Sequence, residues 1–275
     1  MTLVLASFVV CCVAVGSTSF DEQVTFIVKT HERPHCLRKL LQSLRVFFPT
    51  TPLLVADDGE LSLRTQPDPH TVVVTLPYDV GLSAARNALV QRVQTPYFVT
   101  LDDDFVFSER TTLQRLVAVL DARPELDIVA GSLYLPGQES QPYAYAELLD
   151  VVDDGRELRM RKGSHGPVPG FDGCERYDIA LNFFVARTER VRAMGGWDAR
   201  LKLGEHQDFF LRAKRAGLGV AVCPSYATAL HEQDHSDAGY KRKRMREFQF
   251  LRQMLESHGL RRLRLSTGPV YVNLD

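Results

Sequence analysis

The sequence predicts an α/β fold in which helices flank a mostly parallel central sheet, with a smaller mixed region in the second half of the chain. Two observations lead to this prediction. Short apolar runs rich in β-branched residues, such as 24–30 and 97–101, alternate with segments of helical periodicity. Several of these runs end in polar residues, which is typical of parallel strands that bring a binding site to one edge of a sheet.

The first half of the chain has the pattern of a βαβ succession. Pro34 suits a helix start, and apolar side chains recur at helical spacing from Leu37 to Phe48. A second helix begins near Gly81, and Pro124 ends a third. Right-handed crossovers through these helices make the strands between them parallel. The predicted strands cover residues 24–30, 53–56, 72–76, 97–101 and 128–134.

The second half, after Pro136, is less regular. Residues 143–162 predict a hairpin or an insertion, and Asn182 is the sole polar residue inside an otherwise apolar strand. The remaining predicted elements are a loop at 163–170, a strand at 179–186, a helix that starts near Glu205, a strand at 220–223 and a last helix from 237 to 258.

The composition is that of a soluble globular protein, with 45% apolar and 24% charged residues among 275. A formal net charge of −1 argues against binding through bulk positive charge, so no nucleic-acid partner is expected. No Cys-x-x-Cys pair occurs, which argues against cysteine-bound zinc. In an oxidising compartment, Cys174 and Cys223 are the candidate disulfide pair, and Cys36 is left over.

Residues 1–20 are expected to be a signal peptide or a short membrane anchor. Residues 1–16 are almost wholly apolar, a run shorter than the roughly 20 residues of a spanning helix. Ala14, Val15 and Gly16 are small or apolar residues of the kind that precede a cleavage site. Because the positive charge that starts a signal peptide is missing, a buried first strand is the alternative. Secretory entry implies possible membrane association through the N-terminus.

Three consecutive carboxylates, Asp102 to Asp104, end the apolar strand that begins at Tyr97. Adjacent acids repel one another and resist burial. A divalent cation explains them, because hard cations bind carboxylate oxygens. The alternative is that Asp103 or Asp104 caps a following helix.

Four polar sites follow predicted strands: Lys29 and Thr30, Asp57 and Asp58, the segment 81–87, and the acid triplet. An acid after the second strand can bind a base or a ribose, and Arg86 at a helix start favours a diphosphate. The triplet can hold a cation that bridges that diphosphate. Together they predict a nucleotide-diphosphate site, although close helix packing also explains Gly81.

The order of these pieces resembles a GT-A glycosyltransferase, a Rossmann-like fold with an Asp-x-Asp motif. Several segments are similar to the ganglioside-type β-1,4-N-acetylgalactosaminyltransferases, with family 2-like domains, and 178–188 is the most specific. These segments are 24–30, 56–58, 102–107, 170–174, 178–188 and 197–201. The resemblance covers roughly residues 24 to 235. It implies one GT-A domain over 21–275, with a nucleotide-sugar-binding half at 21–135 and an acceptor and catalytic half at 136–275.

The resemblance also implies roles in binding the donor, a UDP-sugar. Thr30 and Asp57 face its uracil and ribose, Arg86 lies near its diphosphate, and Asp102 contacts the nucleotide. Asp103 is grouped with these nucleotide-binding residues, without a separate role of its own.

For the metal and the chemistry, the resemblance implies that Asp104 and His231 bind Mn²⁺ or Mg²⁺, with His235 as a rival ligand. Asp208 corresponds to the general base, with Glu205 as its rival. A helix start also favours acids for purely structural reasons, so Asp208 has a structural alternative.

The implied function is an inverting, metal-dependent transfer of a sugar, N-acetylgalactosamine by resemblance, to a glycan on lipid or protein. The expected location is the secretory pathway: the Golgi lumen, membrane-anchored, or secretion. Two alternatives are a sugar-nucleotidyltransferase and a non-catalytic glycan- or nucleotide-binding module. The first would carry a Gly-rich loop after its first strand, where this chain has residues 29–34 without glycine. The oligomeric state does not follow from the sequence.

Overall fold

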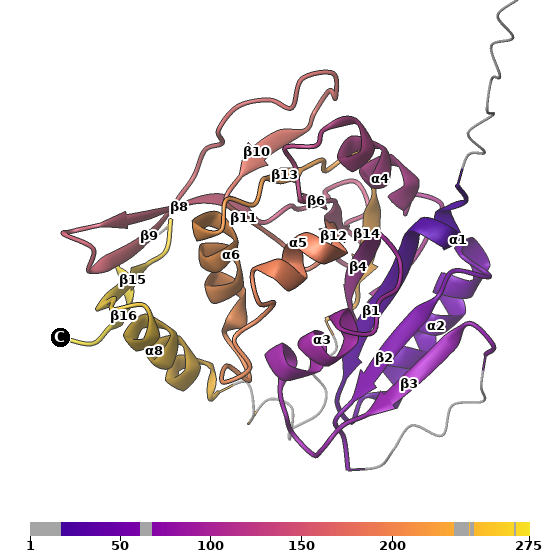
Figure 1. Cartoon of the computed structure of the whole chain (residues 1–275), viewed down its shortest axis with the longest axis horizontal. Coiled ribbons are helices and arrows are strands. Elements are labelled where there is room, and N and C mark those ends of the chain that lie inside the picture. Colours follow the sequence, from indigo (N-terminus) through magenta and orange to yellow (C-terminus); the bar gives the residue numbers. More distant parts are fainter. Residues whose placement is uncertain (1–17, 61–67, 234–241, 243–244, 267) are drawn as a thin grey trace, which may run out of the picture.

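An eight-stranded sheet forms the centre of the computed structural model, which describes residues 18–60, 68–233, 242, 245–266 and 268–275 (Figure 1). Six strands run in one direction, and β12 and β10 run in the other, which confirms the mostly parallel sheet. In spatial order the strands are β10 (Glu175–Tyr177), β13 (Val220–Val222), β6 (Ile128–Ala130), β12 (Phe184–Arg187), β4 (Tyr97–Asp102), β1 (Val24–Thr30), β2 (Leu53–Asp57) and β3 (Thr71–Thr75).

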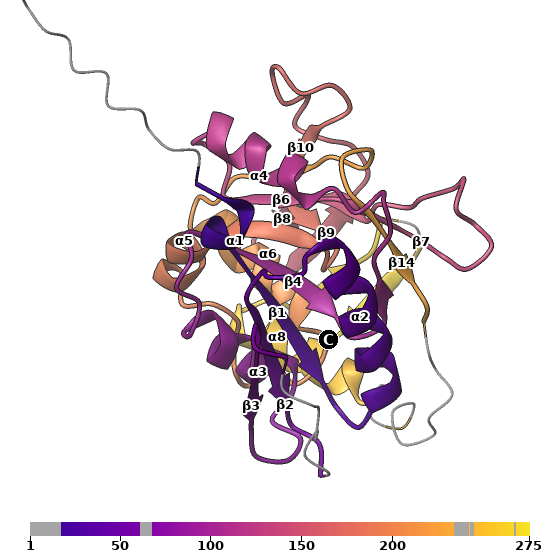
Figure 2. The same cartoon turned by 90° about the vertical axis from the view of Figure 1, so that its right-hand side faces the viewer.

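Helices cover both faces of this sheet, and each face has its own apolar core (Figures 1 and 2). Along β1, Phe26 and Val28 pack on one face, and Ile27 on the other, because successive side chains of a strand alternate. Strands buried on both faces are therefore largely apolar. One face carries α2 (Pro34–Phe47) and α4 (Leu113–Ala122), and the other carries α3 (Leu82–Val90) and α6 (Glu205–Arg215). Two short helices are α1 (Phe20–Gln23) and α5 (Thr188–Ala193).

Two smaller sheets complete the fold, and one of them is the predicted mixed region. It contains β11 (Ile179–Ala180), β8 (Ala146–Val152), β9 (Glu157–Arg161), β15 (Arg262–Arg264) and β16 (Val270–Asn273). The C-terminal strands β15 and β16 and the last helix, α8 (Glu247–Ser257), lie together at this end of the molecule (Figure 1). The other sheet contains β5 (Phe105–Val106), β14 (Thr228–His231) and β7 (Ser132–Tyr134).

Two predicted strands are each divided into two. The run 128–134 breaks at Gly131, after which β7 leaves the large sheet and pairs with β14. A Cβ at Gly131 would lie 2.3 Å from the carbonyl oxygen of Ala227, so only glycine fits where the chain changes sheets. The run 179–186 breaks around Asn182, between β11 and β12. The last helix begins at Glu247, and the predicted start at 237–241 lies outside the described residues.

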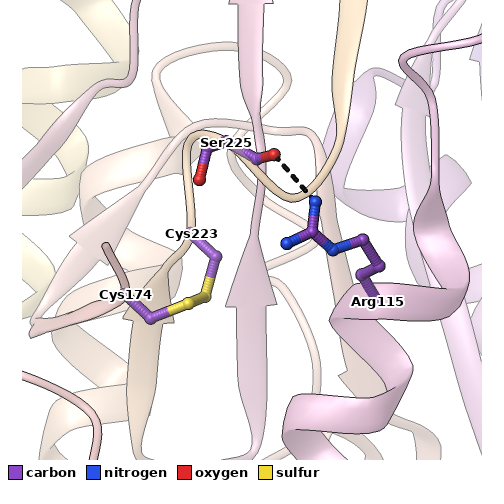
Figure 3. Close-up of a disulfide and its surroundings, with 4 residues drawn as sticks. All are labelled: Arg115, Cys174, Cys223 and Ser225. Carbon is purple, nitrogen blue, oxygen red and sulfur yellow. Dashed lines mark hydrogen bonds between the residues drawn. A yellow bond between two sulfur atoms is a disulfide. The ribbon is translucent and has the colours of Figure 1, made fainter. Parts of the chain in front are cut away.

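The disulfide between Cys174 and Cys223 confirms the predicted pair (Figure 3). It joins residues 49 positions apart, one just before β10 and the other just after β13. Beside it, Arg115 of α4 donates a hydrogen bond to the carbonyl oxygen of Ser225 at 3.2 Å (Figure 3). The disulfide and this hydrogen bond fix the outer edge of the large sheet, away from the carboxyl ends of β1 and β4.

The predicted signal or anchor segment falls on residues 1–17, which are outside the described part, and on the three residues that follow. Phe20 belongs to α1, and Thr18 and Ser19 precede it. Among the helices that the structure describes, none combines the length and the apolar character needed to cross a membrane. The division at residue 135 into two functional halves stays a prediction.

Candidate active site

A cavity of about 390 Å³ lies at the carboxyl ends of β1 and β4, where the sheet meets the first turns of α3 and α6. Both halves of the chain line it, with Lys29 and Asp102 from the first and Asn182, Glu205 and Phe250 from the second. Ligands of open α/β sheets bind at this edge. The cavity is therefore the candidate active site.

Arg33 neutralises two of the three consecutive acids that end β4. Its Nη1 lies 3.1 Å from Asp104 Oδ2, and its Nη2 donates to Asp103 Oδ1. Thr30 Oγ1, at the end of β1, donates to the other oxygen of Asp103 at 2.7 Å. Burial raises the pKa of Asp103 to about 6, although Arg33 opposes the shift. Asp103 and Thr30 thus tie together the ends of two neighbouring strands.

The other oxygen of Asp104, Oδ1, faces His231. It is buried and accepts no hydrogen bond from the part of the chain that the structure describes. His231 Nε2 lies 3.6 Å from it. Burial alone would raise the pKa of Asp104, but His231 and Arg33 lower it below its usual value. Because the chain continues from Asp104 into β5, the helix-cap alternative for these acids is wrong.

A divalent cation fits between Asp104 Oδ1 and His231 Nε2. A buried carboxylate oxygen without a donor, beside an imidazole nitrogen, is a suitable ligand pair for Mn²⁺. The described residues gather no group of three or more His, Cys, Asp or Glu side chains that could hold a metal. A cation here would take its other ligands from a bound substrate and water. The rival ligand His235 lies outside the described residues.

Tyr143 contacts the far side of the His231 ring. Its hydroxyl oxygen lies 2.7 Å from His231 Nδ1, while Nε2 points toward Asp104. Histidines that bind metals are commonly oriented by a hydrogen bond at the second ring nitrogen. The contact therefore holds His231 in the orientation that a metal ligand needs.

Arg86 joins two acids that line the cavity, one at the end of β4 and one at the start of α6. Its Nη1 lies 2.5 Å from Glu205 Oε1, and its Nη2 lies 3.1 Å from Asp102 Oδ1. The guanidinium also stands over the indole of Trp197, 5.8 Å from the ring centre. Burial raises the pKa of Asp102, and Arg86 opposes that shift. Arg86 lines the cavity, and these contacts engage both of its terminal nitrogens, while its predicted place beside a diphosphate stays a prediction.

The two consecutive acids at the end of β2, Asp57 and Asp58, make different contacts. Asp57 is buried, accepts a hydrogen bond from the Gly59 amide at 3.0 Å, and does not line the cavity. Asp58 accepts one from the Gly81 amide at 3.0 Å and lies 2.9 Å from Lys29 Nζ. Burial alone would raise the pKa of Asp58, but its hydrogen bond with His31 and the charge of Lys29 hold it well below the usual range. Asp58 thus joins the ends of β1 and β2 to the start of α3.

Of the two acids at the start of α6, Glu205 lines the cavity and Asp208 does not. Asp208 is buried one turn further along, with Oδ1 2.7 Å from His258 Nε2 at the end of α8. Its second neighbour is Arg212, at 3.9 Å. The structure therefore does not bring Asp208 together with the other candidate residues.

His206 is a cavity residue that the sequence analysis did not single out. Its Nδ1 lies 3.1 Å from Asn182 Oδ1, and its ring contacts those of Tyr145 and Phe210. Burial lowers the pKa of His206 to about 4, so the ring is neutral near pH 7. Asn182, the polar interruption of an apolar run, was the available signal for this pair.

Comparison with known proteins places this site in a family. The family described as glycosyl transferase family 2 matches residues 25–178, which include the acid triplet. Beta-1,4 N-acetylgalactosaminyltransferase 1 of Rattus norvegicus is 41% identical over 194 residues, covering 68% of this chain and 35% of that protein. Beta-1,4 N-acetylgalactosaminyltransferase 2 of Mus musculus is 37% identical over 204 residues, covering 73% and 38%. The chain thus spans a little over a third of the length of these curated relatives.

The fold of this chain is also similar to that of a solved structure. The crystal structure of GalNAc-T7 with UDP, GalNAc and Mn²⁺ superimposes with a TM-score of 0.58 at 14% sequence identity. The match covers 78% of this chain and 44% of that chain. It confirms the GT-A fold expected from the order of strands and acids. From the extent of the family match, the chain belongs to glycosyl transferase family 2.

Proposed function

We propose that the protein is an inverting, metal-dependent glycosyltransferase that moves a sugar from a UDP-sugar to a hydroxyl of a glycan. The observation that carries the proposal is Asp104 Oδ1, which has no hydrogen-bond partner among the described residues and faces His231 in a cavity at the carboxyl edge of the sheet. A second buried acid, Glu205, lines the same cavity. Metal-assisted transfer needs these two features: a ligand for a cation, and a separate base.

The proposed donor is UDP-N-acetylgalactosamine. The relatives with 37% and 41% identity are named for transfer of this sugar, and the GalNAc-T7 structure contains UDP, GalNAc and Mn²⁺. In this proposal the nucleotide lies beside the ends of β1 and β4. Thr30 and Asp57 support that end of the site indirectly. Thr30 donates a hydrogen bond to Asp103, and Asp57 accepts one from the Gly59 amide.

In this proposal Asp104 and His231 hold Mn²⁺ or Mg²⁺. When bound, the cation would neutralise the negative charge that develops on the leaving UDP. Asp102 faces the donor side. Arg86 lies between Asp102 and Glu205 and contacts both carboxylates. Arg33 supplies a fixed positive charge beside the same acids.

We assign the general base to Glu205. An inverting displacement needs a carboxylate on the acceptor's side of the sugar to take the proton of the attacking hydroxyl. Arg86 holds Glu205 through Oε1, and we assign Oε2 to the acceptor hydroxyl. Asp208 contacts His258 outside the cavity lining, so we assign it to the contact between α6 and α8.

The proposed acceptor is a glycan on lipid or protein, and the proposed location is the secretory pathway, in the Golgi lumen or secreted. The disulfide between Cys174 and Cys223 supports an oxidising compartment, where such bonds persist. Membrane association through the N-terminus is part of the proposal. Membership of a glycosyltransferase family favours sugar transfer over nucleotidyl transfer.

The proposal is tested by incubating the purified protein with a panel of UDP-sugars, Mn²⁺ and glycan acceptors, and measuring UDP release and transfer. We expect turnover with UDP-N-acetylgalactosamine that stops when the metal is chelated. Asp104→Asn should abolish it. A matched control is Asp178→Asn, since Asp178 is a buried acid that binds Lys214 and does not line the cavity. No turnover with any donor, or full turnover in chelator, would contradict the proposal.

A further inference from the structure

We propose that Arg86 is a positioning residue that fixes Glu205 and Asp102 relative to each other, and that it is not a ligand of the diphosphate. The inference rests on the proposed function, in which Glu205 takes the acceptor's proton and Asp102 belongs to the donor side. It gives Arg86 a different role from the one implied by the helix start on which it lies.

The guanidinium of Arg86 bridges the two acids. One planar group contacts Glu205 Oε1 through Nη1 at 2.5 Å and Asp102 Oδ1 through Nη2 at 3.1 Å. Its two terminal nitrogens are held rigidly with respect to each other, so two carboxylates bound to them keep a constant separation. The Arg86 side chain is only 3% exposed. It therefore stands between the two acids and is shielded from bulk water.

The start of α3, which carries Arg86, is held by hydrogen bonds that its backbone amides donate. The Gly81 amide donates to Asp58 Oδ2, and the Leu82 amide donates to the carbonyl oxygen of Lys202 at 3.0 Å. The backbone at Gly81 has φ +90°, and a Cβ there would lie 2.5 Å from Lys202 Cα. The start of α3 therefore touches the backbone just before α6, and only glycine permits this approach.

The residue after Arg86 makes a second attachment. Asn87 Nδ2 donates to the carbonyl oxygen of Trp197 at 2.7 Å, and the Trp197 amide donates to Asn87 Oδ1 at 2.8 Å. The segment from Trp197 to Glu205 is thus attached to α3 on both sides of Arg86. Because α3 is anchored in this way, Arg86 can set the position of Glu205 to within a fraction of an ångström. A general base requires this precision.

Loss of the guanidinium would leave the buried Glu205 and the half-buried Asp102 without their shared cation. Glu205 could then rotate or take up a proton. Either change removes a base that is needed in the transition state. Neither change touches Asp104 or His231, which hold the metal in the proposed function. Loss of Arg86 should therefore lower kcat with little effect on donor binding.

The experiment compares Arg86→Gln, Arg86→Lys, Glu205→Gln and the Arg86→Gln, Glu205→Gln double variant, by kcat, KM for UDP-N-acetylgalactosamine and calorimetric Kd for UDP with Mn²⁺. Arg86→Gln should lower kcat about 100-fold and change the Kd for UDP by less than about three-fold. Arg86→Lys keeps the positive charge but loses the planar pair of donors that contacts both acids. Its kcat should therefore be about a tenth of the wild-type value. The double variant should be no slower than Glu205→Gln, because both changes disable one base.

Arg192→Gln is the matched control. Arg192 of α5 binds the carbonyl oxygen of Val90 at 2.7 Å, and so supports the other end of α3 without touching either acid. It should leave kcat within about three-fold of the wild type if general loosening of α3 has little effect. Thermal unfolding shows whether each variant is folded. If Arg86→Gln does not fold, Arg86→Lys replaces it in the comparison of kcat with the Kd for UDP.

Two results would overturn the inference: a Kd for UDP that rises as much as kcat falls, and additive losses in the double variant. The first would make Arg86 a diphosphate ligand, and the second would separate it from Glu205. A wild-type protein that neither binds UDP nor turns over would instead overturn the proposed function on which the inference rests.

Discussion

Asp208 Oδ1 lies 2.7 Å from His258 Nε2, across the contact between α6 and α8. The two side chains come from residues 50 positions apart, and the Asp208 side chain is only 1% exposed. α8 also supplies Glu247 and Phe250 to the cavity wall. The pair therefore fixes the helix that forms one side of the site, while Glu205 at the start of α6 faces the cavity itself.

Asp208→Asn should lower stability more than it lowers the chemical rate. A buried hydrogen bond that involves a charged group contributes about 1.5–3 kcal/mol, and the asparagine keeps the shape but loses the charge. Glu205→Gln, in contrast, should lower kcat by about 10²–10⁴ and leave stability less affected. Thermal unfolding and kcat measured on both variants separate the two roles. A large loss of kcat in Asp208→Asn at full stability would show that Asp208, and not Glu205, is the general base.

The difference between Glu205 and Asp208 shows where sequence reasoning stops. Both acids fall in the first turn of a helix, where either is expected, and local pattern does not decide which one faces a cavity. Packing of α8 decides it, because His258 occupies the neighbourhood of Asp208.

Other parts of the fold depend on local pattern and were predictable. β1 spans the predicted residues 24–30, because a mostly apolar run rich in β-branched residues fits a strand covered on both faces. The break at Gly131 was missed because it depends on Ala227, nearly a hundred residues away. The acid triplet was recognisable as a candidate site, but its ion pairs with Arg33 were not. Arg33 lies 70 and 71 residues before the acids it contacts, so only the folded chain reveals it.

The Tyr143 hydroxyl should strengthen metal binding through His231. Tyr143→Phe removes the hydroxyl that contacts His231 Nδ1, and loss of such a partner weakens metal affinity by about 10- to 100-fold. The Mn²⁺ concentration that half-saturates UDP binding measures the effect. Tyr271→Phe is the control, because Tyr271 is similarly exposed and lies on β16 away from the cavity lining. Equal Mn²⁺ affinity in the wild type and Tyr143→Phe would show that Tyr143 does not orient the ring.

The neutral ring of His206 predicts a loss of stability in acid. Its folded pKa of about 4 is below the unfolded value, so below pH 6.5 the unfolded chain takes up a proton that the folded chain does not. The resulting loss grows as the pH falls from 6.5 toward 4, and is at most about 3 kcal/mol because the ring keeps some exposure. Denaturant unfolding between pH 7 and pH 4.5 measures it, with His206→Gln as the comparison. The variant should lose less stability over this range; an identical pH dependence would place the His206 pKa near its ordinary value.

The disulfide should stabilise the fold without taking part in the chemistry. Closing a loop of 49 residues contributes about 4 kcal/mol on a chain-entropy estimate. The Cys174→Ala, Cys223→Ala double variant should therefore unfold at lower denaturant concentration, while kcat at low temperature stays near the wild-type value. A reductant should shift the wild-type midpoint in the same direction and leave the double variant unchanged. A lower kcat in a fully folded double variant would show that the disulfide shapes the cavity.

Calorimetric titration of UDP into the protein, with and without Mn²⁺, tests the central claim most directly. The account predicts that Mn²⁺ tightens UDP binding to the wild-type chain, and that Asp104→Asn and His231→Ala both remove this effect, because Asp104 Oδ1 and the imidazole that faces it are the proposed metal ligands. UDP binding of equal strength without metal, or Mn²⁺ dependence that survives in Asp104→Asn, would contradict it.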